Sequence, residues 1–268
     1  MMLEINGSKA FAYTGGKAFD AKLPTVVLVH GAQNDHSVWA LQSRYLAHHG
    51  YGVLAVDLPG HGRSAGAALG SVEAIADWIV ALLDKAGVAR ASLVGHSMGA
   101  LVALDCAGRH SGRVAGIAMI GVAYPMKVSD ELLDATKNRE PEAQAMVNLW
   151  LHASLAPYPA NPGPGFWVMG GNARLMQRQK PGVMHTGFAA CNAYAGGTDA
   201  AAKVNCPVLF LLARRDMMTS IRSAQALANL IKGSKTVIVE DCGHNLMGEK
   251  PDETLDALIA FLKSAAQP

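Results

Sequence analysis

Two kinds of hydrophobic segment alternate along the first third of the chain. Short apolar runs rich in β-branched residues occur at 25–29, 52–56 and 92–94, and such runs are typical of parallel strands buried on both faces. Before the last run, residues 71–86 carry apolar side chains at helical spacing, and Gly87 follows as a stop signal. This alternation predicts an α/β fold: a mostly parallel central sheet flanked by helices on both faces.

The pattern changes after a further predicted strand at 113–120. From 122 to 203 no clear strand is seen, and helical stretches are expected at 130–137 and 142–153. A segment that should not form a regular element follows them, because prolines remove backbone donors. Its prolines are Pro157, Pro159, Pro162 and Pro164. We expect this whole region to be a helical insertion that sits over the sheet.

Strand and helix patterns return after the insertion. A buried strand is expected at 207–212, a helix from about Ser220, and another strand at 236–239. The last helix should open at Pro251, since proline suits the first position of a helix. These elements extend the α/β pattern to the end of the chain.

The segment 95–99, Gly-His-Ser-Met-Gly, stands between a predicted strand and a helical stretch that ends at Arg109. A G-x-S-x-G pattern in this context indicates a sharp turn that exposes its serine above the sheet. A side chain at Gly95 or Gly99 should clash where the helix folds back over the strand. Ser97 is therefore the candidate nucleophile, and His96 is expected to point away and to pack.

A serine hydroxyl needs a base within hydrogen-bond reach. His244 follows the last predicted strand, so it should lie at the carboxyl edge of the sheet, where the turn at Ser97 also lies. Asp216 follows the strand at 207–212 and should orient the imidazole. The alternatives are Asp199, which belongs to the insertion or its exit, and Asp241, which is too close to His244 in the chain to reach its ring easily.

Attack on an acyl carbon creates an oxyanion that preorganised N–H donors must meet. The backbone N–H of Met98, at the start of the helix, is one candidate. The other should come from the loop after the first central strand, where the N–H of Ala32 is favoured and that of Gln33 is the alternative.

With these residues identified, the chain resembles the α/β-hydrolase superfamily over nearly all of its length outside the insertion. The resemblance rests on ordered motifs: His30-Gly31 with Trp39 downstream, the stretch 57–64 (Asp-Leu-Pro-Gly-His-Gly-Arg-Ser), the serine turn, Asp216 and Gly243-His244. It implies that the insertion is a cap lining an acyl pocket. It also implies that the stretch 57–64 shapes a turn near the site rather than supplying an acid–base pair.

Apolar residues of the insertion either form its own small core or line the pocket. The candidate substrate-binding residues are Trp150, Trp167, Met184 and Phe188, and Phe166, Met169 and Met176 share their character. Asp35 and His36, in the loop before Trp39, are expected to be solvent-exposed. Cys106 should be a buried core thiol.

The length and composition of the chain limit which folds and functions are possible. The 268 residues suffice for one large domain with a core at 1–121 and 204–268 and a helical, proline- and glycine-rich cap at 122–203. A formal charge of +2 without a basic cluster favours neither nucleic acid nor an anionic membrane as a partner. The N-terminus lacks the features of a secretory signal, and no apolar run approaches the roughly 20 residues that span a bilayer. The four cysteines show no metal-type spacing, so we expect a reduced, cytoplasmic protein. Catalysis by a serine, a histidine and an aspartate requires no metal or cofactor, so we expect none.

The residues together predict a serine hydrolase that cleaves a carboxylic ester or a similar acyl bond through an acyl-enzyme on Ser97, with water as co-substrate. One alternative is carbon–carbon bond hydrolysis of a β-diketone or ring-cleavage product, in which Arg174, Arg178 and Asn192 would handle an enol or ketone. Peroxide chemistry and a non-catalytic small-molecule-binding protein are further alternatives. Epoxide or haloalkane hydrolysis is disfavoured because serine stands where an aspartate nucleophile is needed. The insertion could also serve as a homodimer surface.

Overall fold

The computed structural model describes residues 1–153, 165 and 167–265, and the strands among them form one sheet. The strand order is β1-β2-β4-β3-β5-β6-β7-β8, antiparallel from β1 to β4 and parallel from β4 to β8. The strands are β1 (Met2–Ile5), β2 (Ser8–Tyr13), β3 (Thr25–Val29), β4 (Gly52–Val56), β5 (Ala91–His96), β6 (Val114–Ile120), β7 (Val208–Ala213) and β8 (Lys235–Val239). The predicted α/β architecture is confirmed.

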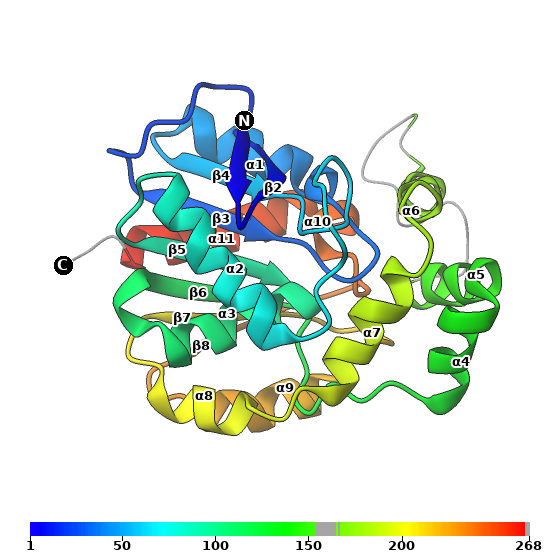
Figure 1. The fold of residues 1–268 in the computed structure, drawn as a ribbon. Coiled ribbons are helices and arrows are strands. Elements are labelled where there is room, and N and C mark those ends of the chain that lie inside the picture. Colours follow the sequence, from blue (N-terminus) through cyan, green and yellow to red (C-terminus); the bar gives the residue numbers. More distant parts are fainter. Residues whose placement is uncertain (154–164, 166, 266–268) are drawn as a thin grey trace.

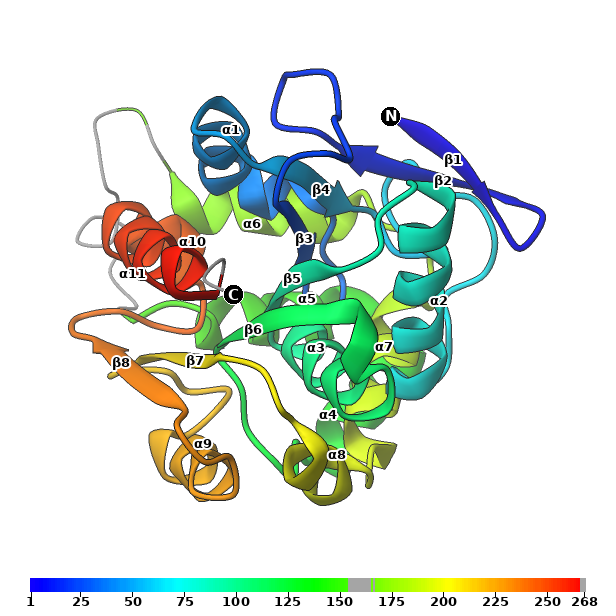
Figure 2. The same ribbon diagram turned by 90° about the vertical axis from the view of Figure 1, so that its left-hand side faces the viewer.

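Helices cover both faces of this sheet, as Figure 2 shows with the sheet seen between α11 and α2. One face packs against α1 (Ala40–His48) and α11 (Pro251–Ala265). The other packs against α2 (Val72–Lys85), α3 (Met98–Arg109) and α9 (Ile221–Ala228). Strands β3, β4, β5 and β7 are buried along their whole length, which explains their continuous apolar sequences.

The insertion is helical in its described part and projects beyond the sheet (Figure 1). Its helices are α4 (Asp130–Asn138), α5 (Glu140–Trp150), α6 (Val168–Gln177), α7 (Val183–Ala193) and α8 (Gly197–Lys203). Helices α4 to α7 share a small apolar core of their own. Helix α8 instead packs on α3, where Gly108 lies against Ala200. The proline-rich stretch and Phe166 lie outside the described residues.

Short elements complete the fold: the 3-10 turns η1 (His36–Trp39) and η2 (Ser111–Arg113), and α10 (Leu246–Glu249). Cys106 is a buried thiol of α3, as expected, and burial raises its pKa to about 12. In the part of the chain that the structure describes, every helix is too short or too polar to cross a lipid bilayer.

The turn between β5 and α3 leaves no room for side chains at its two glycines. A Cβ on Gly95 would overlap the carbonyl of Gly99, and a Cβ on Gly99 would overlap the carbonyl of Val29 at the end of β3. Ser97, at the apex, has a φ of 54°, a left-handed conformation that non-glycine residues rarely adopt. The close crossing of helix and strand thus holds the serine in a strained conformation.

We predict that Gly95→Ala destabilises the protein by about 3 kcal/mol or more, because the new methyl group meets fixed backbone atoms rather than a flexible side chain. Thermal unfolding should show a melting temperature lowered by roughly 6 °C or more. Gly112→Ala is the matched control, since a Cβ there meets nothing within 4 Å. Equal melting temperatures for the two variants would contradict the packing argument.

Candidate active site

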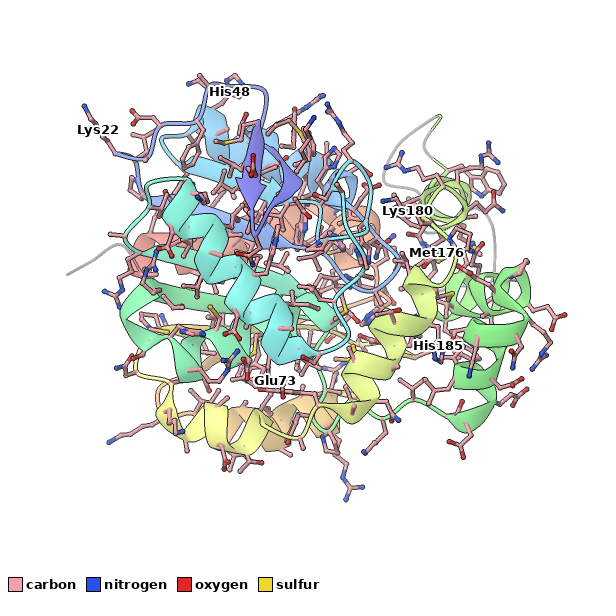
Figure 3. All side chains as sticks on the ribbon, viewed as in Figure 1. Lys22, His48, Glu73, Met176, Lys180 and His185 are labelled. Atoms are coloured by element: carbon pink, nitrogen blue, oxygen red, sulfur yellow. The ribbon has the colours of Figure 1, made fainter. Side chains whose placement is uncertain are left out.

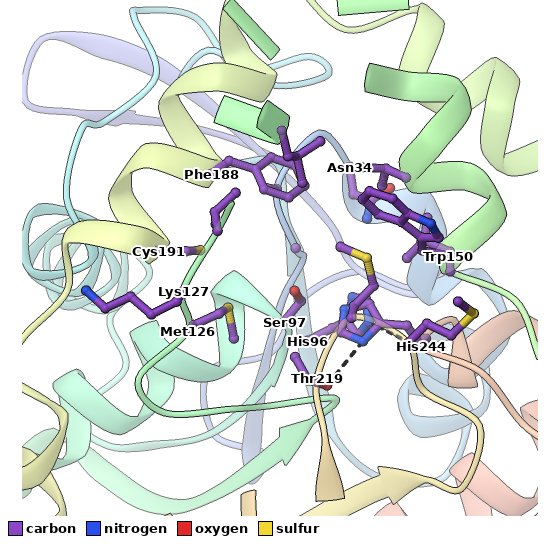
Figure 4. Close-up of a pocket in the computed structure, with 18 of the residues that line it drawn as sticks. Asn34, His96, Ser97, Met126, Lys127, Trp150, Phe188, Cys191, Thr219 and His244 are labelled. Atoms are coloured by element: carbon purple, nitrogen blue, oxygen red, sulfur yellow. Dashed lines mark hydrogen bonds between the residues drawn. The ribbon is translucent and has the colours of Figure 1, made fainter. Parts of the chain in front are cut away.

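Ser97 lies at the carboxyl edge of the sheet, on the floor of a cavity between the sheet and the insertion (Figure 4). Its backbone N–H donates to the carbonyl of Ile120 at 2.9 Å, and its own carbonyl accepts from the N–H of Ala100 at 2.9 Å. These bonds tie the turn to the end of β6 and to the first turn of α3. The side chain is left to face the cavity.

The imidazole of His244 is oriented by the carboxylate of Asp216. The two side chains are each 2% exposed, and Nδ1 lies 2.7 Å from Oδ2 of Asp216. Asp216 also accepts from the backbone N–H groups of Met218 and Thr219, both at 2.7 Å, and from the Thr219 hydroxyl at 2.6 Å. Because an ionised carboxylate only accepts hydrogen bonds, Nδ1 carries the proton and Nε2 of a neutral ring has its lone pair free.

The same contacts decide the ionisation of Asp216. Burial by itself raises the pKa of this carboxyl, but the neighbouring His244 and the donors at Thr219 outweigh it and hold the pKa below its ordinary value. The carboxylate is therefore charged at neutral pH. It can stabilise a positive charge that develops on the ring.

The two alternative carboxylates lie elsewhere. Asp241 has a largely exposed side chain and pairs with Arg215 at 2.6 Å. Asp199 is exposed on α8. The structure thus brings Asp216, and neither alternative, to His244.

Ser97 and His244 line the same cavity. Among the described residues no hydrogen bond joins the Ser97 hydroxyl to the imidazole. A serine hydroxyl turns about one bond, and catalytic hydrogen bonds are often long before substrate binds. Gly121 makes room for the ring, because a Cβ there would lie 2.9 Å from Cε1 of His244.

The candidate oxyanion donors come from two different elements. Met98 begins α3, so its N–H is one of the unpaired donors of a helix N-terminus. Ala32 lines the cavity, whereas Gln33 is not among the lining residues. The side chain of Gln33 instead donates to the carbonyl of Met176 in the insertion at 3.0 Å.

The four candidate substrate-binding residues separate into two groups. Trp150 and Phe188 line the cavity. Met184 is fully buried inside the core of the insertion and does not line the cavity. Trp167 is 64% exposed, and its ring folds back over Gly170 of α6. Its assignment to the pocket was therefore wrong. An aromatic residue at the start of a helix can lie on the outer side of that helix.

Sequence reasoning missed much of the cavity lining. Met217 and Met218 directly follow Asp216, so their position was a usable signal. Asn34 lies two residues after Ala32 on the same loop. Other apolar lining residues come from the start of the insertion: Met126, Val128 and Leu132.

Contrary to the prediction that both are solvent-exposed, Asp35 is buried and His36 is only partly exposed. Asp35 is 1% exposed and forms an ion pair with Arg178 of the insertion at 2.6 Å, and Nδ1 of His36 donates to Asp57 at 2.7 Å. Both side chains bond to partners distant in sequence, which a local reading could not detect. Arg178 thus holds the insertion on the core.

The remaining polar residues once considered for an enol or ketone also have other contacts. Asn192 accepts from the backbone N–H of Val128 at 3.1 Å, and Arg174 donates to Gln177 at 3.1 Å. Neither lines the cavity with Ser97.

The stretch 57–64 forms a turn beside the site. Asp57 accepts from the backbone N–H groups of His36 and Arg63, both at 2.8 Å, and Gly62 has no space for a Cβ against this carboxylate. Potential ligand atoms of Asp35, His36 and Asp57 lie within 4.8 Å of one another. Arg178, Ser37 and backbone N–H groups already occupy the carboxylates, so this group is better explained as part of the turn than as a metal site.

Two histidines near the site are neutral. Burial, with the neighbouring His244, lowers the pKa of His96 to about 3, and its Nε2 donates to the backbone carbonyl of His244 at 2.9 Å. His96 therefore supports the backbone of His244, beyond the packing role expected from the sequence. Burial, with the neighbouring His30, likewise lowers the pKa of His61 to about 3.

Glu249 connects the loop of His244 to the insertion, a contact the sequence gave no reason to expect. Its side chain is buried; one oxygen accepts from the N–H of Gly243 at 3.1 Å and the other from the N–H of Ala153 at 2.9 Å. The N–H of Asn245 also donates to the carbonyl of Leu151 at 2.9 Å. The end of α5 and the imidazole-bearing loop are thus held as one unit.

Comparison with known proteins agrees with the α/β architecture. The model of the alpha/beta hydrolase family matches residues 26–257. The chain is 28% identical to the putative carbamate hydrolase RutD of Caulobacter sp. (strain K31), over 94% of each chain. A 99-residue stretch is 42% identical to the dihydrolipoyllysine-residue acetyltransferase component of the acetoin cleaving system of Pseudomonas putida, but it covers only 26% of that protein. The structure superposes on an esterase from Exiguobacterium antarcticum with a TM-score of 0.85, at 19% identity over 98% of this chain and 99% of the other.

Glu249→Gln should destabilise the protein by about 1–3 kcal/mol, because an amide group replaces one of two accepting oxygens and presents a donor to a backbone N–H. Thermal melting measures the loss, and hydrolysis by the same variant should fall through kcat, since the loop of His244 loses support. Glu253→Gln is the control, because this exposed residue makes only a long ion pair with Lys250 at 3.6 Å. An unchanged melting temperature in Glu249→Gln would contradict the assignment.

His61 should make the protein less stable as the pH falls. With a folded pKa of about 3 and an ordinary value near 6.5, the unfolded chain takes up a proton between these values that the folded chain does not. The free energy of unfolding should therefore fall by about 1.4 kcal/mol per pH unit from this residue. Urea unfolding from pH 6.5 downward should show a shallower dependence in His61→Asn. His48→Asn, at an exposed position (Figure 3), should leave the dependence as in the parent; equal slopes for all three would refute the assignment.

Proposed function

Because this chain belongs to the alpha/beta hydrolase family, we propose that it is a serine hydrolase that cleaves a carboxylic ester or a similar acyl bond through an acyl-enzyme on Ser97. The observation that carries the proposal is the His244–Asp216 pair, bonded at 2.7 Å, whose imidazole lines the same cavity as Ser97. Nucleophile, base and orienting carboxylate in one place are the requirement of this chemistry.

In the proposed reaction Nε2 of His244 takes the proton of the Ser97 hydroxyl as its oxygen attacks the acyl carbon. Asp216 stabilises the imidazolium that results. The N–H groups of Ala32 and Met98 would donate hydrogen bonds to the oxyanion. Each donor of this kind typically lowers the activation free energy by about 3–4 kcal/mol. His244 then protonates the leaving group, and the same steps with water in place of serine release the acid.

The cavity supports small substrates. Its volume is about 180 Å³, and most of its lining is apolar. An engineered protein cavity of about 150 Å³ holds benzene, so this one suits a group only slightly larger. The helices α4 to α7 would act as the cap that covers it.

Ester-like bonds are favoured over the alternatives. Carbon–carbon bond hydrolysis would need polar groups for an enol or ketone, and Arg174, Arg178 and Asn192 make other contacts outside the cavity. The relative from Caulobacter is named a putative carbamate hydrolase, and a carbamate is an acyl bond that the same residues could cleave. A non-catalytic binding protein has no use for an oriented imidazole beside a serine.

Ser97→Ala should lower the kcat for p-nitrophenyl butyrate by roughly 10⁴-fold or more, since removal of a serine nucleophile leaves only binding and oxyanion stabilisation. A fluorophosphonate probe should label the parent protein at Ser97, as read by peptide mass spectrometry, and should not label the variant. Ser111→Ala, in the η2 turn outside the cavity, should keep the parent rate. Labelling at another residue, or full activity in Ser97→Ala, would exclude the proposed mechanism.

A further inference from the structure

We propose that Asn34 selects the substrate: its side-chain amide binds a neutral polar group, a hydroxyl or an amide, on an otherwise small and apolar acyl compound. This inference rests on the proposed function, because it assigns the substrate class of the same cavity. Its starting point is a polar side chain that lines the cavity and is 7% exposed. Figure 4 shows Asn34 beside Trp150 in the lining.

The loop that carries Asn34 is fixed on both sides. Gln33 donates to the carbonyl of Met176 at 3.0 Å, and Asp35 accepts from Arg178 at 2.6 Å. The N–H of Asn34 donates to the carbonyl of Gly31. Both neighbouring side chains are thus committed to the insertion, and the position of Asn34 is set before any ligand binds.

The amide of Asn34, by contrast, has no partner within the described residues. Its oxygen is buried without a hydrogen bond, and its nitrogen makes none either. A buried amide oxygen without a partner costs about 1–3 kcal/mol. Such a group in a cavity wall is a ready site for a ligand that supplies the missing bonds.

Of the other polar groups of the lining, Nδ1 of His96 is likewise without a partner in the described part of the chain, whereas Ser129 and Lys127 bond to the backbone. The hydroxyl of Ser129 caps α4 by accepting from the N–H of Leu132 at 3.2 Å. Lys127 extends away from Ser97 in Figure 4 and donates to the carbonyl of Asn192 at 3.3 Å. Burial raises the pKa of Cys191 to about 12, so this lining residue is a neutral thiol.

These facts define the ligand chemistry. A carboxamide offers one acceptor and two donors, so a hydroxyl or a second amide can satisfy it. Among the described residues no free cation would lie near a carboxylate at this place, because the Lys127 ammonium bonds to the carbonyl of Asn192. Burial of an unpaired charge is costly. A purely hydrocarbon group would leave the amide unsatisfied.

The test measures the hydrolysis of four kinds of methyl ester by pH-stat titration. Methyl butyrate is compared with methyl 2-hydroxybutyrate, methyl 3-hydroxybutyrate (each enantiomer) and methyl succinamate. The parent protein should hydrolyse at least one polar ester with a kcat/KM about tenfold above that of methyl butyrate. In Asn34→Leu, which has a similar shape and no polar atoms, this preference should fall to about one. Asn34→Ala provides a second test of the same ratio if the leucine does not fit.

Gln42→Met is the matched control. Gln42 also has a buried amide oxygen without a partner, but it does not line the cavity. Its substitution should leave the ratio of polar to apolar esters as in the parent. A preference that persists in Asn34→Leu and in Asn34→Ala, or a parent protein that hydrolyses all of these esters equally well, would overturn the assignment.

A binding experiment separates this inference from the proposed function. Calorimetry with the Ser97→Ala variant measures affinity for the same esters without turnover. The assignment is supported if Ser97→Ala binds a polar ester more tightly than methyl butyrate and the double variant Ser97→Ala/Asn34→Leu does not. This result supports the assignment even if the parent protein cleaves none of the esters. If the parent protein hydrolyses esters and is labelled at Ser97, but the affinities for polar and apolar esters do not differ, the serine hydrolase proposal stands and the role of Asn34 is rejected.

Discussion

The site depends on how closely α3 approaches the sheet. Gly95 and Gly99 allow the backbone of the turn to contact the carbonyls of its own helix and of β3, where a methyl group would not fit. Ser97 is held at a positive φ by this contact, and α3 begins at the next residue, Met98. One steric constraint therefore sets the position of the proposed nucleophile and of one proposed oxyanion donor.

The polar groups around this constraint form two sets of contacts. The pair His244–Asp216 is held by Thr219 and by His96, which bonds to the backbone of His244. A second set, led by Asp35–Arg178 and by Glu249, joins the loops of the core to the insertion. The first set orients the imidazole, and the second keeps the apolar cover above it, so the cavity is shaped before a ligand enters.

Much of this arrangement could be predicted from the sequence. Buried parallel strands have continuous apolar sequences, and signals such as Gly87 after α2 and Pro251 at the start of α11 placed these helix ends well. The meeting of Asp216 with His244 followed from their positions after β7 and β8. The hairpin β1–β2 and the helices α6 to α8 were missed, because the hairpin is short and partly exposed and α6 contains two adjacent glycines.

What the sequence could not predict depends on contacts between distant residues. Asp35 looks like a solvated loop residue until Arg178, 143 positions later, is seen beside it. Trp167 and Met184 are large and apolar, as pocket residues often are, but the orientation of their helices places them outside the cavity. The contacts of Glu249 also have a consequence for the insertion. The insertion is fastened to the loop next to Ala32 and, separately, to the loop of His244, so a graft of a foreign cap onto this core would need compatible anchors for both loops to preserve the site beneath it.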